Sequence, residues 1–174
     1  GDDNVFREYV TVNRATDEGR ETVIGSRNLL MAYVHVAHDC TLDDDVILAN
    51  SVNLAGHVTL GRHAIVGGVT PVHQFVRIGK FAMLRGLSRT SRDVPPYCIM
   101  DGTHTVKAIN QVGLERAGYS KEAIGEIKRA FSQLFRRKSY LAQAIQELVV
   151  VVADIHGTGT QDPQTGMQTG RVKA

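Results

Sequence analysis

Residues 30–60 read LMAYVHVAHDCTLDDDVILANSVNLAGHVTL, and an aliphatic side chain returns there at every sixth position. The same phase runs from Ile24 to Leu84 without an insertion. A period of six fits neither an amphipathic helix nor an alternating strand, and it is typical of hexapeptide-repeat proteins. The eleven positions in phase are Ile24, Leu30, Val36, Leu42, Leu48, Leu54, Leu60, Val66, Val72, Ile78 and Leu84.

Such a repeat predicts a triangular prism in which each hexad forms one side and three hexads form a coil of 18 residues. The aliphatic residue points inward, and the residue after it is usually small, as at Gly61, where the chain turns the corner. Successive coils stack as parallel strands about 4.8 Å apart. We therefore predict a mainly β chain that forms a left-handed parallel β-helix, with an earlier partial coil at 5–12 and a bulging loop at 16–20. A sandwich of alternating strands fits less well, because its turns would be irregularly spaced.

The hexad pattern ends after Arg89. We do not expect Asp93-Val94-Pro95-Pro96 to continue a strand ladder, because proline has no amide donor and restricts the residue before it. Residues 119–148 have helical periodicity, with Ser120 as an N-cap. The predicted divisions are the β-helix at 1–100, a C-terminal helical region at 101–156 and a flexible tail, rich in Gly, Thr and Gln, at 157–174.

Composition narrows the classes of function. A net charge of +2 without a Lys/Arg run gives no indication of a nucleic-acid partner. Two cysteines are too few for a disulfide framework and favour a reducing, cytoplasmic setting. No stretch approaches the roughly 20 apolar residues of a membrane-spanning helix. The chain begins at Gly1 without Met or a signal peptide, so we expect a processed or truncated product.

Residues 18 apart should lie directly above one another, which assembles a polar patch. A histidine beside a carboxylate is held in one tautomer and can act as a general base, and a glycine one coil away can offer its N–H to an oxyanion. No Ser or Cys nucleophile falls in the patch, so the pattern predicts direct acyl transfer without a covalent acyl-enzyme. The predicted columns are His38, Gly56 and Gln74; Asp39, His57 and Phe75; and Ala37, Ala55 and His73.

Other functions remain open at this point. Prisms of this kind can also place histidines around Zn²⁺, but Cys40 should face the core and we predict no metal site. Another hexapeptide transferase, with an amine acceptor or an acetyl-CoA donor, fits the same residues. So does a non-catalytic or metal-binding trimeric scaffold.

Several long motifs resemble the UDP-N-acetylglucosamine O-acyltransferases, the enzymes that open lipid A biosynthesis. The likeness extends over roughly residues 5 to 150. Its motifs are Asn28-Leu29-Leu30-Met31, the run from His35 to Thr41, Ile47-Leu48-Ala49-Asn50, the run from Leu54 to Val58, Val72-His73-Gln74-Phe75, Asp93-Val94-Pro95-Pro96-Tyr97 and the run from Gly113 to Ser120.

This resemblance implies a homotrimer with active sites between adjacent prisms. It implies transfer of an (R)-3-hydroxyacyl chain from acyl carrier protein to the 3-hydroxyl of UDP-N-acetylglucosamine, with no cofactor besides the carrier's 4′-phosphopantetheine. His38 matches the family's base, Asp39 its orienting carboxylate and Gly56 the N–H donor at the thioester carbonyl. The substrate-contacting positions are matched by His35, His57, His73, Gln74, Asn110 and Arg116, and the acyl-chain positions by Met83 and Gly86.

The family's first coils, which carry an Asp and a Lys that contact the sugar nucleotide, have no counterpart before Gly1. We expect either that these coils are cut from this chain or that the protein works without them. Arg85, beside Gly86, stands at a position where small or apolar residues are common in the family. The length of the acyl chain is therefore left open.

Overall fold

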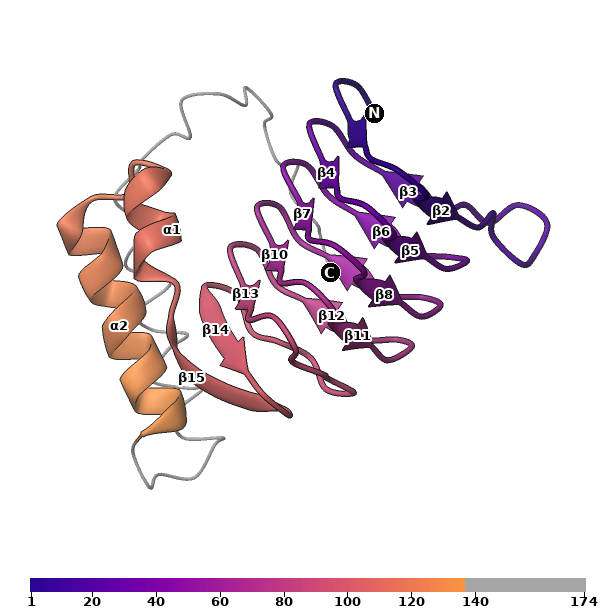
Figure 1. The fold of residues 1–174 in the computed structure, drawn as a ribbon. Coiled ribbons are helices and arrows are strands. Elements are labelled where there is room, and N and C mark those ends of the chain that lie inside the picture. Colours follow the sequence, from indigo (N-terminus) through magenta and orange to yellow (C-terminus); the bar gives the residue numbers. More distant parts are fainter. Residues whose placement is uncertain (137–174) are drawn as a thin grey trace, which may run out of the picture. The chain divides into compact units, whose positions relative to one another are not determined.

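The computed structural model describes residues 1–136, and its repeat region consists of two-residue strands at regular intervals (Figure 1). A longer hairpin and two helices follow. The strands are β1 (Val5–Phe6), β2 (Thr11–Val12), β3 (Val23–Ile24), β4 (Leu29–Leu30), β5 (His35–Val36), β6 (Thr41–Leu42), β7 (Ile47–Leu48), β8 (Asn53–Leu54), β9 (Thr59–Leu60), β10 (Ile65–Val66), β11 (Pro71–Val72), β12 (Arg77–Ile78), β13 (Met83–Leu84), β14 (Cys98–Asp101) and β15 (Thr105–Ile109), and the helices are α1 (Gln111–Arg116) and α2 (Lys121–Phe135).

From β1 to β13, strands pair with the strand three places along the chain, which gives the prism three faces. One sheet has the order β1-β4-β7-β10-β13-β14-β15, and the other two are β11-β8-β5-β2 and β12-β9-β6-β3. Pairing between the coils is parallel, and Val36 lies opposite Leu54, 18 residues away. The predicted left-handed parallel β-helix is therefore confirmed in its coil length, its stacking and its parallel pairing.

The first coil has a different spacing because a loop interrupts it. Val12 lies opposite Val36, a separation of 24 residues, whereas Val23 lies opposite Thr41, a separation of 18. The six extra residues belong to the segment between β2 and β3. The partial coil at 5–12 and the bulging loop predicted at 16–20 are both confirmed.

The interior of the prism is a continuous aliphatic column. Leu48, Leu54 and Leu60 are completely buried, and so are Val52 and Val58 of the compact positions between them. Burying a side chain of this size stabilises the fold by about 1.5–3 kcal/mol. The inward orientation predicted for the hexad residues is thus confirmed from Leu30 onward, and Ile24 in the first coil is half-buried.

The corners of the prism impose steric conditions on the chain. At the corner after β9 the residue that follows the inward aliphatic must be small, because a Cβ on Gly61 would lie 2.6 Å from the backbone N of Lys80 in the next coil. Two residues further on, the backbone takes a positive φ, as at Asp39 (59°) and His57 (61°). This left-handed conformation is unfavourable for residues with a side chain. The coil therefore repeatedly places non-glycine residues in strained backbone at its corners.

One more coil follows Arg89 than we predicted. Thr90 bridges to Val72 and Val94 bridges to Ile78 in parallel. The Val94 N–H donates to the Arg77 carbonyl at 2.9 Å, and the Val94 carbonyl accepts from the Gly79 N–H at 2.9 Å. The expectation that Asp93–Pro96 cannot continue the ladder was wrong. Both prolines come after Val94, at the corner, where the ladder does not require an N–H donor.

The segment after this coil also differs from the prediction. We grouped residues 101–109 with the helical region, but β14 and β15 form an antiparallel hairpin that extends the first sheet. Thr105–Ile109 pairs with an available sheet edge, and this tertiary pairing outweighs local propensity.

The helical prediction is confirmed for α2, whose first turn is capped by the Ser120 hydroxyl, which accepts from the Ala123 N–H at 3.2 Å. The chain divides into compact units at residues 1–128 and 129–174. In the described part of the second unit, the Phe131 and Phe135 rings pack with centroids 5.0 Å apart. Within residues 1–136, neither helix is long and apolar enough to cross a membrane. The rest of the predicted helical region and the tail at 157–174 lie outside the described residues.

The corner geometry predicts that Gly61→Ala destabilises the protein by about 1–3 kcal/mol, because the new methyl would press on the backbone of the next coil. Urea unfolding checks this. Gly125→Ala is the matched control: its Cβ would meet nothing within 4 Å, and in a helix the change should stabilise by about 0.5–1 kcal/mol. Equal effects of the two substitutions would contradict the packing described for the corner.

Candidate functional site

His38 and Asp39 lie at the corner between β5 and β6, and their side chains are hydrogen-bonded. The His38 Nδ1 and Asp39 Oδ2 atoms are 2.8 Å apart. An ionised carboxylate can only accept, so Nδ1 carries the proton and Nε2 is the basic nitrogen of the neutral ring. The Asp39 side chain is 5% exposed, and that of His38 is 39% exposed. The pair therefore presents an accessible imidazole supported by a nearly covered carboxylate.

Two donors from Thr16 complete the surroundings of Asp39. The Thr16 hydroxyl donates to Oδ2 at 2.7 Å and the Thr16 N–H at 3.2 Å. The Thr16 hydroxyl, followed by His38, lowers the pKa of Asp39 from 3.8 to about 2, although desolvation opposes the shift. The second oxygen, Oδ1, is buried and has no hydrogen-bond partner among residues 1–136. Asp39 is thus a stable anion whose contacts are concentrated on one oxygen.

Gly56 lies one coil further on, directly against the His38 ring. A Cβ at this position would be 2.5 Å from the His38 Cε1 atom and 2.7 Å from Nε2. The imidazole therefore occupies the space that any larger residue at 56 would fill, so this approach requires glycine. The predicted column of His38 and Gly56 is confirmed.

The second predicted column is also confirmed, by contacts between its rings. His57 stacks on Phe75 with centroids 4.6 Å apart, and it meets the His38 ring edge-on at 5.1 Å. Its Nε2 atom is 3.9 Å from Asp39 Oδ2. His57 thus borders the same carboxylate as His38 and is held by an aromatic neighbour.

Three more predicted residues come from the same sheet and corner. His35, in β5, has its Nδ1 2.7 Å from the Thr11 hydroxyl oxygen. His73 and Gln74 follow β11 and are exposed, with the His73 Nδ1 3.2 Å from the Gln74 carbonyl oxygen. Because β5, β8 and β11 are neighbours in one sheet, the structure brings the predicted histidines to one side of the prism.

Asn110 lies at a different corner. Its side-chain amide donates to the Phe81 carbonyl at 2.9 Å, and its side-chain oxygen accepts from the Gly113 N–H at 3.2 Å as the N-cap of α1. Phe81 is one corner along the chain from Phe75. Asn110 is 4% exposed, and its side chain is used to join α1 to the prism. A substrate contact from Asn110 stays a prediction.

The remaining predicted residues also lie away from His38. Met83 belongs to β13, in the seven-stranded sheet, which does not contain β5. A Cβ on Gly86 would lie 3.4 Å from the Gly68 carbonyl oxygen, at the third corner. Arg116 is exposed in the last turn of α1. Within one chain, the predicted acyl-chain and nucleotide residues are therefore not part of the histidine cluster.

The cluster also has the composition of a metal site. His38, Asp39 and His57 each offer a ligand atom, and these atoms lie within 4.8 Å of one another. Cys40 does not join them, because it is buried as predicted and its thiol donates to the Ala55 carbonyl at 3.2 Å. The geometry alone therefore admits either a general base or a three-ligand site for a transition metal.

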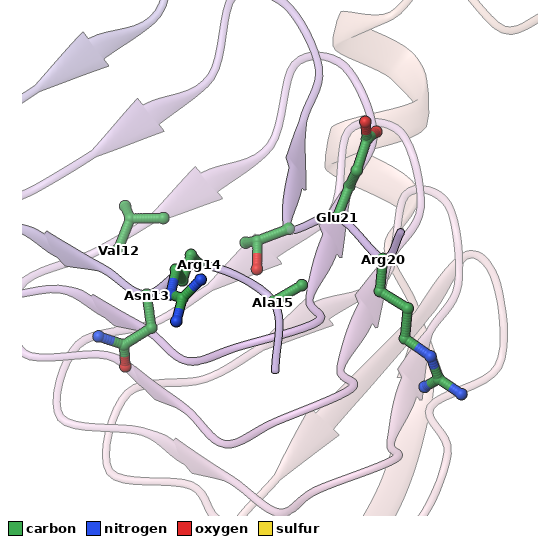
Figure 2. Close-up of a pocket in the computed structure, with 7 residues that line it drawn as sticks. Val12, Asn13, Arg14, Ala15, Arg20 and Glu21 are labelled. Atoms are coloured by element: carbon green, nitrogen blue, oxygen red, sulfur yellow. The ribbon is translucent and has the colours of Figure 1, made fainter. Parts of the chain in front are cut away.

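Val12 and the loop between β2 and β3 line a hollow (Figure 2). None of the predicted site residues lines it. Thr22, one of its lining residues, accepts a 2.9 Å hydrogen bond from the Asp39 backbone N–H. The residues around the hollow are Val12, Asn13, Arg14, Ala15, Arg20, Glu21 and Thr22.

Sequence reasoning did not identify Thr16 or Thr22 as neighbours of Asp39. Thr16 is 23 residues away in the chain, and the loop that carries it departs from the six-residue period. The 18-residue spacing between stacked positions therefore does not predict where Thr16 lies. The one signal available was the interruption of the hexads between Val12 and Ile24.

Two family models match separate parts of the chain. Residues 21–56 match the bacterial transferase hexapeptide (six repeats), and residues 93–168 match domain 2 of UDP N-acetylglucosamine O-acyltransferase. The first match covers the coils around His38, and the second begins at the coil that contains Val94.

Curated relatives and solved structures agree with these matches. The chain is 52% identical over 149 residues to an acyl-(acyl-carrier-protein)–UDP-N-acetylglucosamine O-acyltransferase of Synechocystis sp., which covers 85% of this chain and 54% of the relative. The same name belongs to a protein of Alkalilimnicola ehrlichii that is 50% identical over 151 residues. The structure of a UDP-N-acetylglucosamine acyltransferase from Campylobacter jejuni has a TM-score of 0.82 at 39% identity, and covers 86% of this chain and 60% of that one. The chain thus spans a little over half the length of the relatives it matches.

The depressed pKa of Asp39 gives a prediction about acid stability. Because the pKa is about 2 in the folded protein and ordinarily 3.8, the ionised carboxylate stabilises the fold above pH ~4, and this contribution is lost as the pH falls towards 2. We expect Asp39→Asn to be less stable than the unaltered chain near neutral pH, and the difference to shrink below pH ~4. Urea unfolding across this range measures it, with Asp17→Asn as the control for an exposed carboxylate of the same loop. A difference that does not change with pH would contradict this assignment.

Proposed function

This chain belongs, over 85% of its length, to the UDP-N-acetylglucosamine O-acyltransferase family, and we propose that it takes part in that family's reaction. The reaction is transfer of an (R)-3-hydroxyacyl group from acyl carrier protein to the 3-hydroxyl of UDP-N-acetylglucosamine. The observation that carries the proposal is the His38–Asp39 pair, with Nδ1 and Oδ2 2.8 Å apart, packed against Gly56.

In the proposed mechanism, the basic Nε2 of His38 removes the proton of the sugar hydroxyl as the oxygen attacks the thioester carbonyl. The protonated imidazole is stabilised by the negative charge of Asp39. The tetrahedral intermediate then expels the phosphopantetheine sulfur, to which His38 returns the proton. The ester and the free thiol are the products, and His38 is restored.

Gly56 supplies the donor for the oxyanion in this proposal. No hydrogen bond within residues 1–136 uses its N–H, so the group is available to a ligand. A backbone donor held by the stacked coils needs no reorganisation when negative charge develops on the carbonyl oxygen.

The distribution of the other predicted residues supports a homotrimer. Met83, Gly86, Asn110 and Arg116 lie on faces and corners other than that of His38. They can contribute to one binding site only if the corner of one prism meets another face of a neighbouring copy. A closed threefold ring satisfies this condition with three identical sites.

Cys40 and Cys98 are free thiols, which fits the proposed cytoplasmic location.

Binding of a transition metal is the second candidate function, and the proximity of His38, Asp39 and His57 favours it. The two candidates make different demands on His38. A base needs its proton-accepting nitrogen free for substrate, whereas a metal would occupy a ring nitrogen permanently. Metal analysis of the purified protein distinguishes them.

We expect acyl transfer to UDP-N-acetylglucosamine from at least one of a panel of 3-hydroxyacyl carrier proteins. His38→Ala should lower kcat by about 10²–10⁴-fold, which is the usual contribution of general base catalysis. A coupled assay of carrier-protein thiol release measures the rate. Thermal unfolding should show that the variant remains folded, because His38 contributes nothing to the core.

His63→Ala is the matched control. The His63 ring is tilted against the Phe81 ring with centroids 4.6 Å apart, and its Nε2 is 3.7 Å from Asp45 Oδ2, so His63 is the counterpart of His57 at the next corner. The proposal assigns it no role, so its turnover should stay within about twofold of the unaltered chain. Full turnover in His38→Ala would rule out His38 as the base. Stoichiometric zinc bound by the cluster would favour the metal site instead.

A further inference from the structure

We infer that Thr16, on the loop inserted between β2 and β3, is a positioning residue for the proposed acyl transfer. It holds the Asp39 carboxylate in the orientation in which Oδ2 accepts the hydrogen bond from the His38 Nδ1–H group. The inference rests on the proposed function of His38 as the base.

The loop is the one interruption of the hexad period between β1 and β13. β2 and β3 are separated by ten residues, Asn13 to Thr22, where the other consecutive strands of these coils are separated by four. Beyond the loop, the 18-residue register resumes without an offset. The insertion is therefore accommodated entirely outside the prism, and it is available for a purpose other than stacking.

Both ends of this loop contact Asp39. Near its start, the Thr16 hydroxyl and N–H donate to Oδ2 at 2.7 and 3.2 Å. At its end, the Thr22 hydroxyl accepts from the Asp39 backbone N–H at 2.9 Å. The loop thus fixes both the backbone and the carboxylate of the residue that orients the base.

Apart from Thr16, the Asp39 carboxylate has only the His38 ring as a hydrogen-bond partner among residues 1–136. Its Oδ1 has no hydrogen-bond partner among residues 1–136, and the torsion that exchanges the two carboxylate oxygens is soft. Without Thr16, rotation of the carboxylate would carry the acceptor away from the line of the His38 Nδ1–H bond. Two Thr16 donors on Oδ2 select a single orientation.

At the next corner, an aspartate has positively charged partners in place of neutral ones. Asp45 occupies the position equivalent to Asp39, but its oxygens accept from the Arg27 and Arg62 guanidinium groups at 2.7 and 3.2 Å. These cations compensate the charge of Asp45. Thr16 instead offers a neutral hydroxyl and a neutral amide, which orient Asp39 and leave its negative charge available to an imidazolium. The loop therefore supplies the type of donor that a base-orienting carboxylate requires.

The test is a double-mutant cycle in the acyl-transfer assay with Thr16→Val and Asp39→Asn. Val has the shape of Thr without the hydroxyl, and residue 16 is exposed, so the fold should be kept. Outer hydrogen-bond partners in metal sites change function by about 10–100-fold, and we expect the lower end, about tenfold in kcat with KM unchanged. Thr16→Ser should restore turnover, and Asp17→Asn should match the unaltered chain as the control for the loop.

The Asp39→Asn background separates positioning from a general structural effect. If Thr16 acts through Asp39, adding Thr16→Val to Asp39→Asn should cause little further loss. Full additivity would overturn the inference, and so would unchanged kcat in Thr16→Val beside an inactive His38→Ala. No turnover in the unaltered chain would instead overturn the acyl-transfer proposal, and with it the role of Thr16.

Discussion

The 18-residue register between successive coils is the constraint on which the rest of the structure depends. It is maintained by backbone hydrogen bonds between coils, such as those from the Ala37 N–H to the Leu54 carbonyl at 3.1 Å and from the Ala55 N–H to the Val72 carbonyl at 3.0 Å. A slip of one hexad would leave the aliphatic column intact, because every side of the prism has the same inward residue. It would, however, move Gly56 away from His38. Core packing thus permits several registers, and the unbroken run of hexads from Ile24 to Leu84 selects one.

The backbone at the corners brings the side chains of successive coils together at the candidate site. Asp39 and His57 both occupy left-handed backbone positions, one above the other. Their side chains are therefore displayed at the edge of the prism, close enough for Asp39 to contact two imidazoles. Since each corner of the coil has this backbone, the strain belongs to the fold and does not by itself mark function. Among residues 1–136, this corner is distinguished by a carboxylate that no Arg or Lys pairs with and by the glycine that packs against the His38 ring.

Most of the prism and the central columns could be predicted from the sequence, because both follow from a strict period. Stacking at 18 residues places His38 on Gly56 and Asp39 beside His57 without any knowledge of tertiary structure. The features that were missed have no period. Thr16 reaches Asp39 through a loop of irregular length, Val94 continues the ladder in a coil shortened by two residues, and Asn110 is used as a helix cap. Each of these depends on contacts between segments that the repeat does not relate.

The preparation of His38 as a base can be tested through its tautomer, measured from the ¹⁵N chemical shifts of its ring nitrogens in selectively labelled protein at a pH where the ring is neutral. We predict that Nδ1 carries the proton, that Nε2 is unprotonated, and that Asp39→Ala abolishes this preference. A neutral His38 protonated at Nε2, or one whose tautomers do not respond to Asp39, would contradict the claim that the stacked coils prepare His38 as a base.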